Sequence, residues 1–226
     1  MTLSAARRTP LFDQVVEQLR EQITSGRWPV GSRIPIEPEL AEQLGVARGT
    51  VREAVRALAH NGLLDIRQGS GTYVAATSEL AGVMRRRFTG IGRADIRELR
   101  MTLETSAAAL AAVRRTEADL LLLQETLDQR DRAWDEGDTE RFVQADAAFH
   151  HAVVAAAHNA ALTGLYADLG EVLRDELRDY LTSGLVPERK IDHGRLVAAI
   201  RAGDAAAATR EATHFFPQLA EGRESQ

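Results

Sequence analysis

The chain has 226 residues, of which 44% are hydrophobic and 27% charged, and it carries a formal net charge of −5 at pH 7. This length is enough for two compact domains or one large one. It contains no cysteine, which excludes disulfides and thiolate metal sites and fits a reducing compartment. No stretch approaches the roughly 20 uncharged apolar residues of a membrane span, and MTLSAARRTP lacks the apolar core of a signal peptide. These features predict a cytoplasmic protein outside the membrane.

Two helices are expected in the first 45 residues. Five apolar residues recur at helical spacing and predict a helix of about four turns that stops at Ser25-Gly26: Phe12, Val15, Val16, Leu19 and Ile23. A shorter helix is expected roughly from Glu37 to Leu44, with Leu40, Ala41 and Leu44 on its inner side, and Gly45 makes the turn that follows it.

The next helix has two distinct faces, and a hairpin follows it. Its apolar face consists of Val51, Ala54, Val55 and Leu58, while arginines recur every fourth residue on the other side, at positions 48, 52 and 56. After Gly62, Leu64 and Ile66 alternate with polar residues, the sequence QGSG at 68–71 turns the chain, and 72–74 returns as a second strand. One face of the helix can pack and the other can meet DNA.

Residues 10–75 resemble the winged helix-turn-helix of GntR-type bacterial transcription regulators. Three motifs in the same order carry the resemblance: GSRIPIEPE at 31–39, a VxRxTVREAxRxL helix and a GxGTxV wing. The resemblance implies sequence-specific binding to double-stranded DNA. An alternative for the arginines is a solvated helix face, as is common in a highly charged chain; the preceding helix and the glycine wing favour DNA binding.

The resemblance also implies which residues meet DNA. Arg48 and Arg52 would reach guanine edges or phosphates, because the two-pronged arginine donor set matches the paired acceptors of guanine. Gly69 at the wing tip would let the backbone approach DNA without an intervening side chain. The predicted DNA-binding residues are Arg48, Gly49, Thr50, Arg52, Gln68 and Gly69.

Two positions depart from the family pattern. Pro38 stands where relatives usually carry an arginine in the second helix, so one DNA contact is expected to be missing, although proline is tolerated in a first helical turn. Gly49 stands where a small polar residue is frequent, which removes a possible phosphate contact.

The charge is divided between two regions. Residues 1–78 carry nine arginines and eight acidic residues, a net charge of +1, whereas residues 79–226 carry nineteen basic and twenty-five acidic residues, a net charge of −6. A local arginine patch on a near-neutral domain predicts modest nonspecific affinity and a need for correct base contacts or dimerisation.

The sequence beyond the wing is helical throughout, so the expected fold is mainly α. We expect a winged helix-turn-helix domain at 1–75, a linker at 76–79, and an all-α bundle of about seven helices at 80–226 that binds the effector and dimerises. The expected helices are 79–89, 93–114, 116–136, 138–157, 160–183, 187–202 and 204–220.

Four residues of this bundle are candidate metal ligands. Asp146 and His150 are four residues apart on one helix and point to the same side, and His193 and His214 lie on the last two helices. One oxygen and three nitrogens suit Zn²⁺, Mn²⁺ or Ni²⁺. Spacing alone also allows capping or surface histidines, and it does not exclude His151 and His158 as ligands.

A second resemblance supports the metal reading. DAAFHHAVVAAAHNAAL and DHGRLVAAIRAGDAAAATREATHF resemble the D-x-x-F-H…N and final H…H elements of the FCD ligand-binding domain in FadR-type GntR regulators. The resemblance implies that Asp146, His150, His193 and His214 hold a divalent cation. The spacing from Asp204 to His214 is one residue shorter than the family pattern.

The resemblance also implies an effector site near this cation. Arg100 matches the arginine of the family's R-x-x-x-E element and would anchor the carboxylate of a small organic acid, with Asn159 as a second effector-binding residue. The alternative for Arg100 is an ion pair with Glu104 at i+4.

These features together predict a one-component transcription regulator, not an enzyme. In this family such a protein is most often a repressor that binds a palindromic operator as a homodimer. The alternatives are a metal-dependent hydrolase fused to a DNA-binding module and an architectural DNA-binding protein without an effector. No nucleophile motif or phosphate loop accompanies the metal candidates, which argues against the hydrolase.

Overall fold

The computed structural model describes residues 10–182, 184–185 and 190–214. The chain divides between Arg87 and Phe88 into two compact units. We call residues 10–87 the N-terminal unit and the described residues from 88 onward the helical bundle. Among the described helices, none combines the length and apolarity that a membrane span requires.

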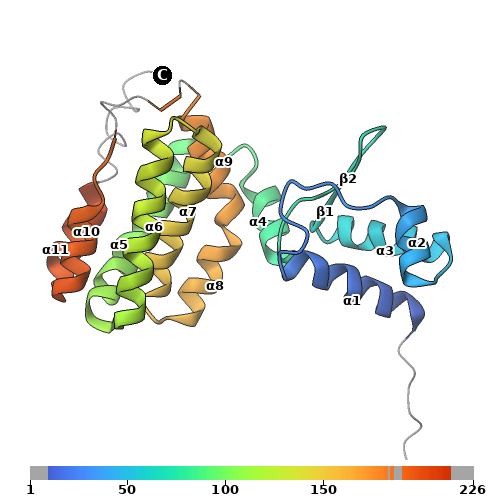
Figure 1. The fold of residues 1–226 in the computed structure, drawn as a ribbon, viewed down its shortest axis with the longest axis horizontal. Coiled ribbons are helices and arrows are strands. Elements are labelled where there is room, and N and C mark those ends of the chain that lie inside the picture. Colours follow the sequence, from blue (N-terminus) through green and yellow to red (C-terminus); the bar gives the residue numbers. More distant parts are fainter. Residues whose placement is uncertain (1–9, 183, 186–189, 215–226) are drawn as a thin grey trace, which may run out of the picture. The chain divides into compact units, whose positions relative to one another are not determined.

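The N-terminal unit is three helices and a β-hairpin, followed by a fourth helix (Figure 1). Its elements are α1 (Leu11–Thr24), α2 (Glu37–Leu44), α3 (Arg48–His60), β1 (Leu64–Arg67), β2 (Gly71–Val74) and α4 (Glu79–Phe88). The apolar faces of α1 and α3 pack against each other and bury Leu19, Ile23 and Leu58. The winged helix-turn-helix predicted from the sequence is confirmed.

The wing is a two-stranded antiparallel sheet that a third extended segment joins. Leu64 pairs with Val74 and Arg67 pairs with Gly71. Residues 31–34 run beside β2, where the backbone N–H of Ile34 donates to Thr72 O at 3.0 Å. Leu64, Val74 and Ile34 are all buried, so the face of the wing that carries them packs into the core of the N-terminal unit.

Helix α4 packs on the N-terminal unit. Glu79 at its start accepts hydrogen bonds from Arg20 on α1, at 2.8 Å, and from Asn61 after α3, at 3.0 Å. Gly82 lies against Gly62, and a Cβ at Gly82 would stand 2.5 Å from the Gly62 carbonyl oxygen. The close approach of these two backbones therefore depends on glycine at position 82.

The helical bundle contains seven helices and no strand in its described part (Figure 1). They are α5 (Arg93–Arg114), α6 (Glu117–Asp135), α7 (Thr139–Ala155), α8 (Ala160–Asp168), α9 (Gly170–Tyr180), α10 (Gly194–Ala202) and α11 (Ala205–His214). Four alanines on α5 are fully buried, at 107, 108, 111 and 112. Their small side chains allow α10 and α11 to pack closely on this helix.

Two of the expected helices differ from the observed ones, and part of a third is not described. The helix expected over 160–183 is divided at Leu169, which ends α8 and caps α9 with helical backbone angles. Of the helix expected over 187–202, residues 187–189 lie outside the described part; residues 190–193 are not helical, and α10 begins at Gly194, whose N–H donates to the Asp192 carboxylate at 2.7 Å. The expected residues 215–220 of the last helix lie outside the described part of the chain.

Candidate DNA-binding surface and buried ligand site

The helix α3 presents unpaired arginines at its start. Arg48 and Arg52 are exposed and, within the described part of the chain, form no ion pair. Arg56, one turn further, is held by Glu53 at 3.1 Å. Gly49 is exposed and Thr50 is half-buried. The amino-terminal half of α3 therefore offers the guanidinium groups that are free to meet a polyanion.

The wing presents its own polar surface. Gln68 and Gly69 are exposed at the tip, and Gly69 has φ +73°, in the left-handed region. Arg67 is paired with Asp65 at 2.9 Å and stacks on Tyr73, with its guanidinium carbon 4.4 Å from the ring centroid. The tip can thus approach DNA with backbone atoms and the Gln68 amide.

Helix α2 begins as the sequence led us to expect. Pro38 lies in the first turn, where its missing N–H costs no helical hydrogen bond. The Glu39 carboxylate instead accepts the Ile36 N–H at 3.2 Å. Proline at this position is compatible with the fold and leaves no side-chain donor for DNA there.

Three of the four predicted metal ligands lie together inside the helical bundle. Asp146 and His150 come from α7, and His193 precedes α10; their ligand atoms lie within 4.8 Å of one another. Their residues are between 2% and 4% exposed. We call these three residues the Asp–His cluster.

Both imidazoles of the Asp–His cluster are oriented by acceptors at Nδ1. His150 Nδ1 lies 2.7 Å from Glu104 Oε2, and His193 Nδ1 lies 3.1 Å from the Ile191 carbonyl oxygen. An acceptor at Nδ1 favours the tautomer with the proton on Nδ1 and the lone pair on Nε2, the arrangement that metal-ligating histidines use. Glu104 is itself fixed by Arg100 at 2.6 Å and by the Tyr166 hydroxyl at 2.5 Å.

The carboxylate of Asp146 is bonded by two buried arginines. Arg100 Nη2 donates to Oδ2 at 3.0 Å, and Arg130 Nε donates to Oδ1 at 2.8 Å. Arg130 comes from α6 and is 2% exposed. Sequence reasoning did not select it, although Arg130 follows Leu127 by three residues and precedes Trp134 by four, on the buried face of its helix. A charged residue in that register is the signal that could have found it.

The electrostatics of the site follow from this network. Burial would raise the pKa of Asp146, but His150 and the two arginines hold it well below its usual value. Burial would lower the pKa of His150, but the carboxylates of Glu104 and Asp146 raise it. Burial and the Arg130 guanidinium hold the pKa of His193 well below its usual value. His193 is therefore neutral at pH 7, the state in which an imidazole binds metal.

The Asp–His cluster fits a divalent ion in part. His150 Nε2 and Asp146 Oδ1 are 3.7 Å apart, close to the separation of about 3.4 Å between ligands of a tetrahedral ion with bonds near 2.1 Å. The mixed nitrogen and oxygen donors suit Zn²⁺, Mn²⁺ or Ni²⁺. His214 is exposed at the end of α11 and lies outside this group. His151 is exposed as well, so the structure supplies three donors.

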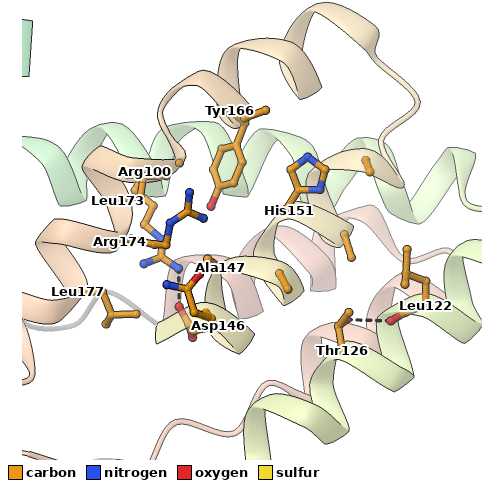
Figure 2. A pocket seen from close by; sticks show the side chains of 16 residues that line it. Arg100, Leu122, Thr126, Asp146, Ala147, His151, Tyr166, Leu173, Arg174 and Leu177 are labelled. Atoms are coloured by element: carbon orange, nitrogen blue, oxygen red, sulfur yellow. Dashed lines mark hydrogen bonds and ion pairs between the residues drawn. The ribbon is translucent and has the colours of Figure 1, made fainter. Parts of the chain in front are cut away.

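A pocket of about 570 Å³ adjoins this network (Figure 2). Its wall includes Arg100, Asp146, Tyr166 and Arg174, and small apolar side chains of α7 form much of the remainder. Arg174 is held by Glu171 at 2.5 Å. Guanidinium groups from α5 and α9, with a phenol from α8, therefore border one cavity, an arrangement suited to a small anion with hydroxyl groups.

The two residues predicted to bind an effector are placed differently. Arg100 lines the pocket while bonded to Glu104 and Asp146. The ion pair with Glu104 that the i+4 spacing allowed is present, and it coexists with the position on the pocket wall. Asn159 caps α8 by accepting the Leu162 N–H at 3.2 Å and is not among the residues that line the pocket.

A winged helix-turn-helix with exposed arginines, joined to a helical bundle with a buried polar site and a pocket, defines a one-chain DNA-binding regulator. Residues 11–74 match the model of the bacterial regulatory proteins of the gntR family, and residues 95–216 match the FCD domain. The chain belongs to the GntR family of transcription regulators, in the FadR-like group that carries an FCD domain.

Relatives that match most of the chain agree with this assignment. HTH-type transcriptional regulator LutR of Bacillus subtilis (strain 168) is 32% identical over 197 residues, covering 82% of this chain and 89% of that protein. The galactonate operon transcriptional repressor of Escherichia coli (strain K12) is 29% identical, covering 88% and 91%. The Uxu operon regulator of Haemophilus influenzae is 29% identical, and the match takes in 70% of this chain and 59% of that protein.

A solved structure has the same fold. The GntR protein of Streptococcus agalactiae superposes with a TM-score of 0.51 at 30% identity, covering 96% of this chain and all of that chain.

Proposed function

We propose that this protein is a metabolite-responsive repressor that binds a palindromic operator as a homodimer and releases it when a small hydroxy acid enters the bundle. The observation that carries the proposal is the pocket bordered by Arg100, Tyr166 and Arg174 within a regulator of this family. The two guanidiniums suit a carboxylate, and the phenol suits a hydroxyl group.

A sugar acid fits this chemistry. The repressor of the galactonate operon is among the relatives, and galactonate has one carboxylate and several hydroxyl groups. We further propose that a divalent ion at the Asp–His cluster assists effector binding, since Asp146 belongs both to that cluster and to the pocket wall. A metal there would supply a positive charge beside the bound acid.

DNA release requires that the effector bind the DNA-incompetent arrangement of the protein more tightly than the competent one. Arg100 links the pocket to Glu104 and Asp146, so an acid that draws the Arg100 guanidinium into the pocket would disturb contacts of α5 with α7. A shift of packed helices is the kind of two-state change that can alter the placement of DNA-binding units.

The test begins with selection of DNA sequences by the purified full-length chain, followed by fluorescence anisotropy on the selected duplex. We expect a two-fold symmetric sequence that binds at least 1,000 times more tightly than scrambled DNA, on the order of the usual specificity ratio. D-galactonate, L-lactate and acetate are then titrated in, and a hydroxy acid should weaken binding while acetate does not. Equal affinity for selected and scrambled DNA would refute the regulator proposal.

The pocket is tested with one variant at its wall and one control variant away from it. Arg174→Gln should lower the affinity for the acid while leaving DNA affinity unchanged, because Arg174 lies in the bundle and borders the cavity. Arg132→Gln changes an exposed arginine on α6 that does not line the pocket and serves as the matched control. An acid response that Arg174→Gln leaves intact would move the effector site elsewhere.

A further inference from the structure

The polar core of the bundle already pairs its buried arginines with carboxylates. Arg100 and Arg130 are both buried, and the buried carboxylates of Glu104 and Asp146 balance them. A divalent ion at the Asp–His cluster would add two positive charges to this paired network in a poorly solvated place. Such an excess is unfavourable unless an anion enters or a cation withdraws.

Arg130 hydrogen-bonds the same carboxylate oxygen of Asp146 that a metal would bind. Its Nε donates to Asp146 Oδ1 at 2.8 Å, and the same oxygen lies 3.7 Å from His150 Nε2. A metal shared by His150 and Asp146 would bind between those two atoms. The guanidinium of Arg130 is therefore placed to repel an ion at this position and to compete for Asp146, the carboxylate member of the Asp–His cluster.

Further contacts hold Arg130 in this position. Its Nη1 donates to Asp131 Oδ1 at 3.1 Å and to the Ile191 carbonyl oxygen at 3.3 Å. The same carbonyl oxygen lies 3.1 Å from His193 Nδ1. The guanidinium carbon also lies 4.9 Å from the centroid of the Phe142 ring. Arg130 thus contacts Asp146 directly and shares the Ile191 carbonyl oxygen with His193.

We propose that Arg130 is a built-in counter-cation of Asp146 that competes with a divalent ion for the Asp–His cluster. The inference rests on the proposed metal site and adds a regulation of it. A metal on Asp146 Oδ1 would share that oxygen with the guanidinium and be repelled by its charge, so the arginine sets the threshold of metal concentration at which the site fills.

The experiment compares metal affinity in three full-length proteins after removal of metal by a chelator. Arg130→Met replaces the guanidinium by an uncharged chain of similar length. Arg132→Met makes the same change at an exposed position on the same helix and is the matched control. Isothermal titration with Zn²⁺ and with Mn²⁺ gives the dissociation constants, and thermal melting with and without metal gives an independent readout.

We expect Arg130→Met to bind at least one of the two ions 10- to 100-fold more tightly than the wild type, on the order of effects seen when groups around a metal site change. Added metal should raise its melting temperature more than that of the wild type. Arg132→Met should match the wild type in both measurements. Arg130→Gln, which keeps a neutral donor for Asp146, should show the same direction as Arg130→Met.

Three outcomes overturn the proposal in distinguishable ways. Equal, measurable metal affinity in wild type and Arg130→Met removes the role of Arg130 and leaves the metal site standing. No metal binding in either protein removes the metal site as well, while operator binding remains to be judged separately. If both Arg130 variants fail to fold with and without metal, Arg130 is a structural cation that no metal replaces, and the proposal is also overturned.

Discussion

Single arginines on the N-terminal unit differ in whether a carboxylate already holds them. Arg27 is paired with Glu21 and Arg56 with Glu53, whereas Arg48 and Arg52 form no ion pair in the described part of the chain. An arginine without a local partner gives up less when it binds phosphate or guanine, because no existing ion pair must be broken. The exposure of an arginine side chain alone therefore does not predict whether it binds DNA.

The first prediction concerns these two arginines. Arg48→Ala or Arg52→Ala should weaken specific DNA binding by about 1 to 3 kcal/mol each, the cost of one good base contact. Folding should be retained, since both side chains are exposed. Anisotropy with the selected operator measures the loss, and Arg56→Ala is the control, with a smaller expected effect. Loss of affinity for scrambled DNA by the same factor would assign the arginine to phosphates instead.

Glu104 illustrates how one buried carboxylate can make the bundle sensitive to acid. Burial would raise its pKa, but Arg100 and His150 lower it from 4.5 to about 2. A carboxyl whose pKa is lower in the folded protein than in the unfolded chain stabilises the fold above the unfolded pKa. That contribution is lost as the pH falls from about 4.5 toward 2.

The second prediction follows from the direction of this pKa shift. The free energy of unfolding of the wild type should fall between pH 5 and pH 2.5, with Glu104 contributing up to about 3 kcal/mol of the change. Glu104→Gln should be less stable at pH 7 and show a flatter profile over this range, measured by urea denaturation. Glu98→Gln alters an exposed glutamate of the same helix and should keep the wild-type slope. An unchanged slope in Glu104→Gln would contradict the argument.

Among the secondary-structure elements, α4 depends on a contact between two backbones. Gly82 approaches the Gly62 carbonyl so closely that a Cβ would stand 2.5 Å from its oxygen and 2.7 Å from its carbon. Backbone atoms cannot swing aside as a flexible side chain can, so the whole helix would have to move. Glu79 opposes that movement through its bonds to Arg20 and Asn61.

The third prediction is that Gly82→Ala destabilises the N-terminal unit by about 1 to 3 kcal/mol, the usual cost of overpacking. Gly164→Ala is the matched control. Gly164 lies in α8, and a Cβ there meets nothing within 4 Å. It should therefore leave stability unchanged or raise it by up to about 1 kcal/mol, because alanine favours helix. Thermal denaturation compares the two, and equal melting temperatures would show that α4 can shift without cost.

Element types could be predicted from the sequence because apolar periodicity and glycine turns are local signals. The division at Leu169 could not, since that residue keeps helical backbone angles and the apolar pattern runs on through it. In the site, Asp146 and His150 were found because they share a helix. Arg130 and Tyr166 belong to other helices, and only the packing of α6 and α8 brings them to α7. Contacts between residues on different helices produce no regular spacing in the sequence from which they could be predicted.

For the molecule as a whole, the modest charge of the DNA-binding region sets how it can reach useful affinity. Residues 1–78 carry a net charge of +1, and the remainder carries −6. Long-range attraction to DNA is weak under this balance. Two linked DNA-binding units would compensate, because the second unit binds at a high effective concentration once the first is bound.

The fourth prediction tests this argument. A duplex with both half-sites should bind about 10² to 10⁴ times more tightly than a duplex of equal length with one half-site scrambled. Anisotropy titrations give the ratio, and sedimentation of the free protein should show a dimer at the same concentrations. A ratio near one, or a monomer in sedimentation, would refute the homodimer.

The packing of α4 on the N-terminal unit determines where a hybrid regulator can be joined. Because Glu79 and Gly82 fasten α4 to the N-terminal unit, a hybrid regulator that borrows only this bundle should be spliced within residues 89–92. That stretch contains Gly90, with φ +83°, and Gly92. A junction at residues 76–79 would separate α4 from Gly62, against which Gly82 packs. Such a hybrid would carry a helix without its partner, and the DNA-binding half would lose part of its support.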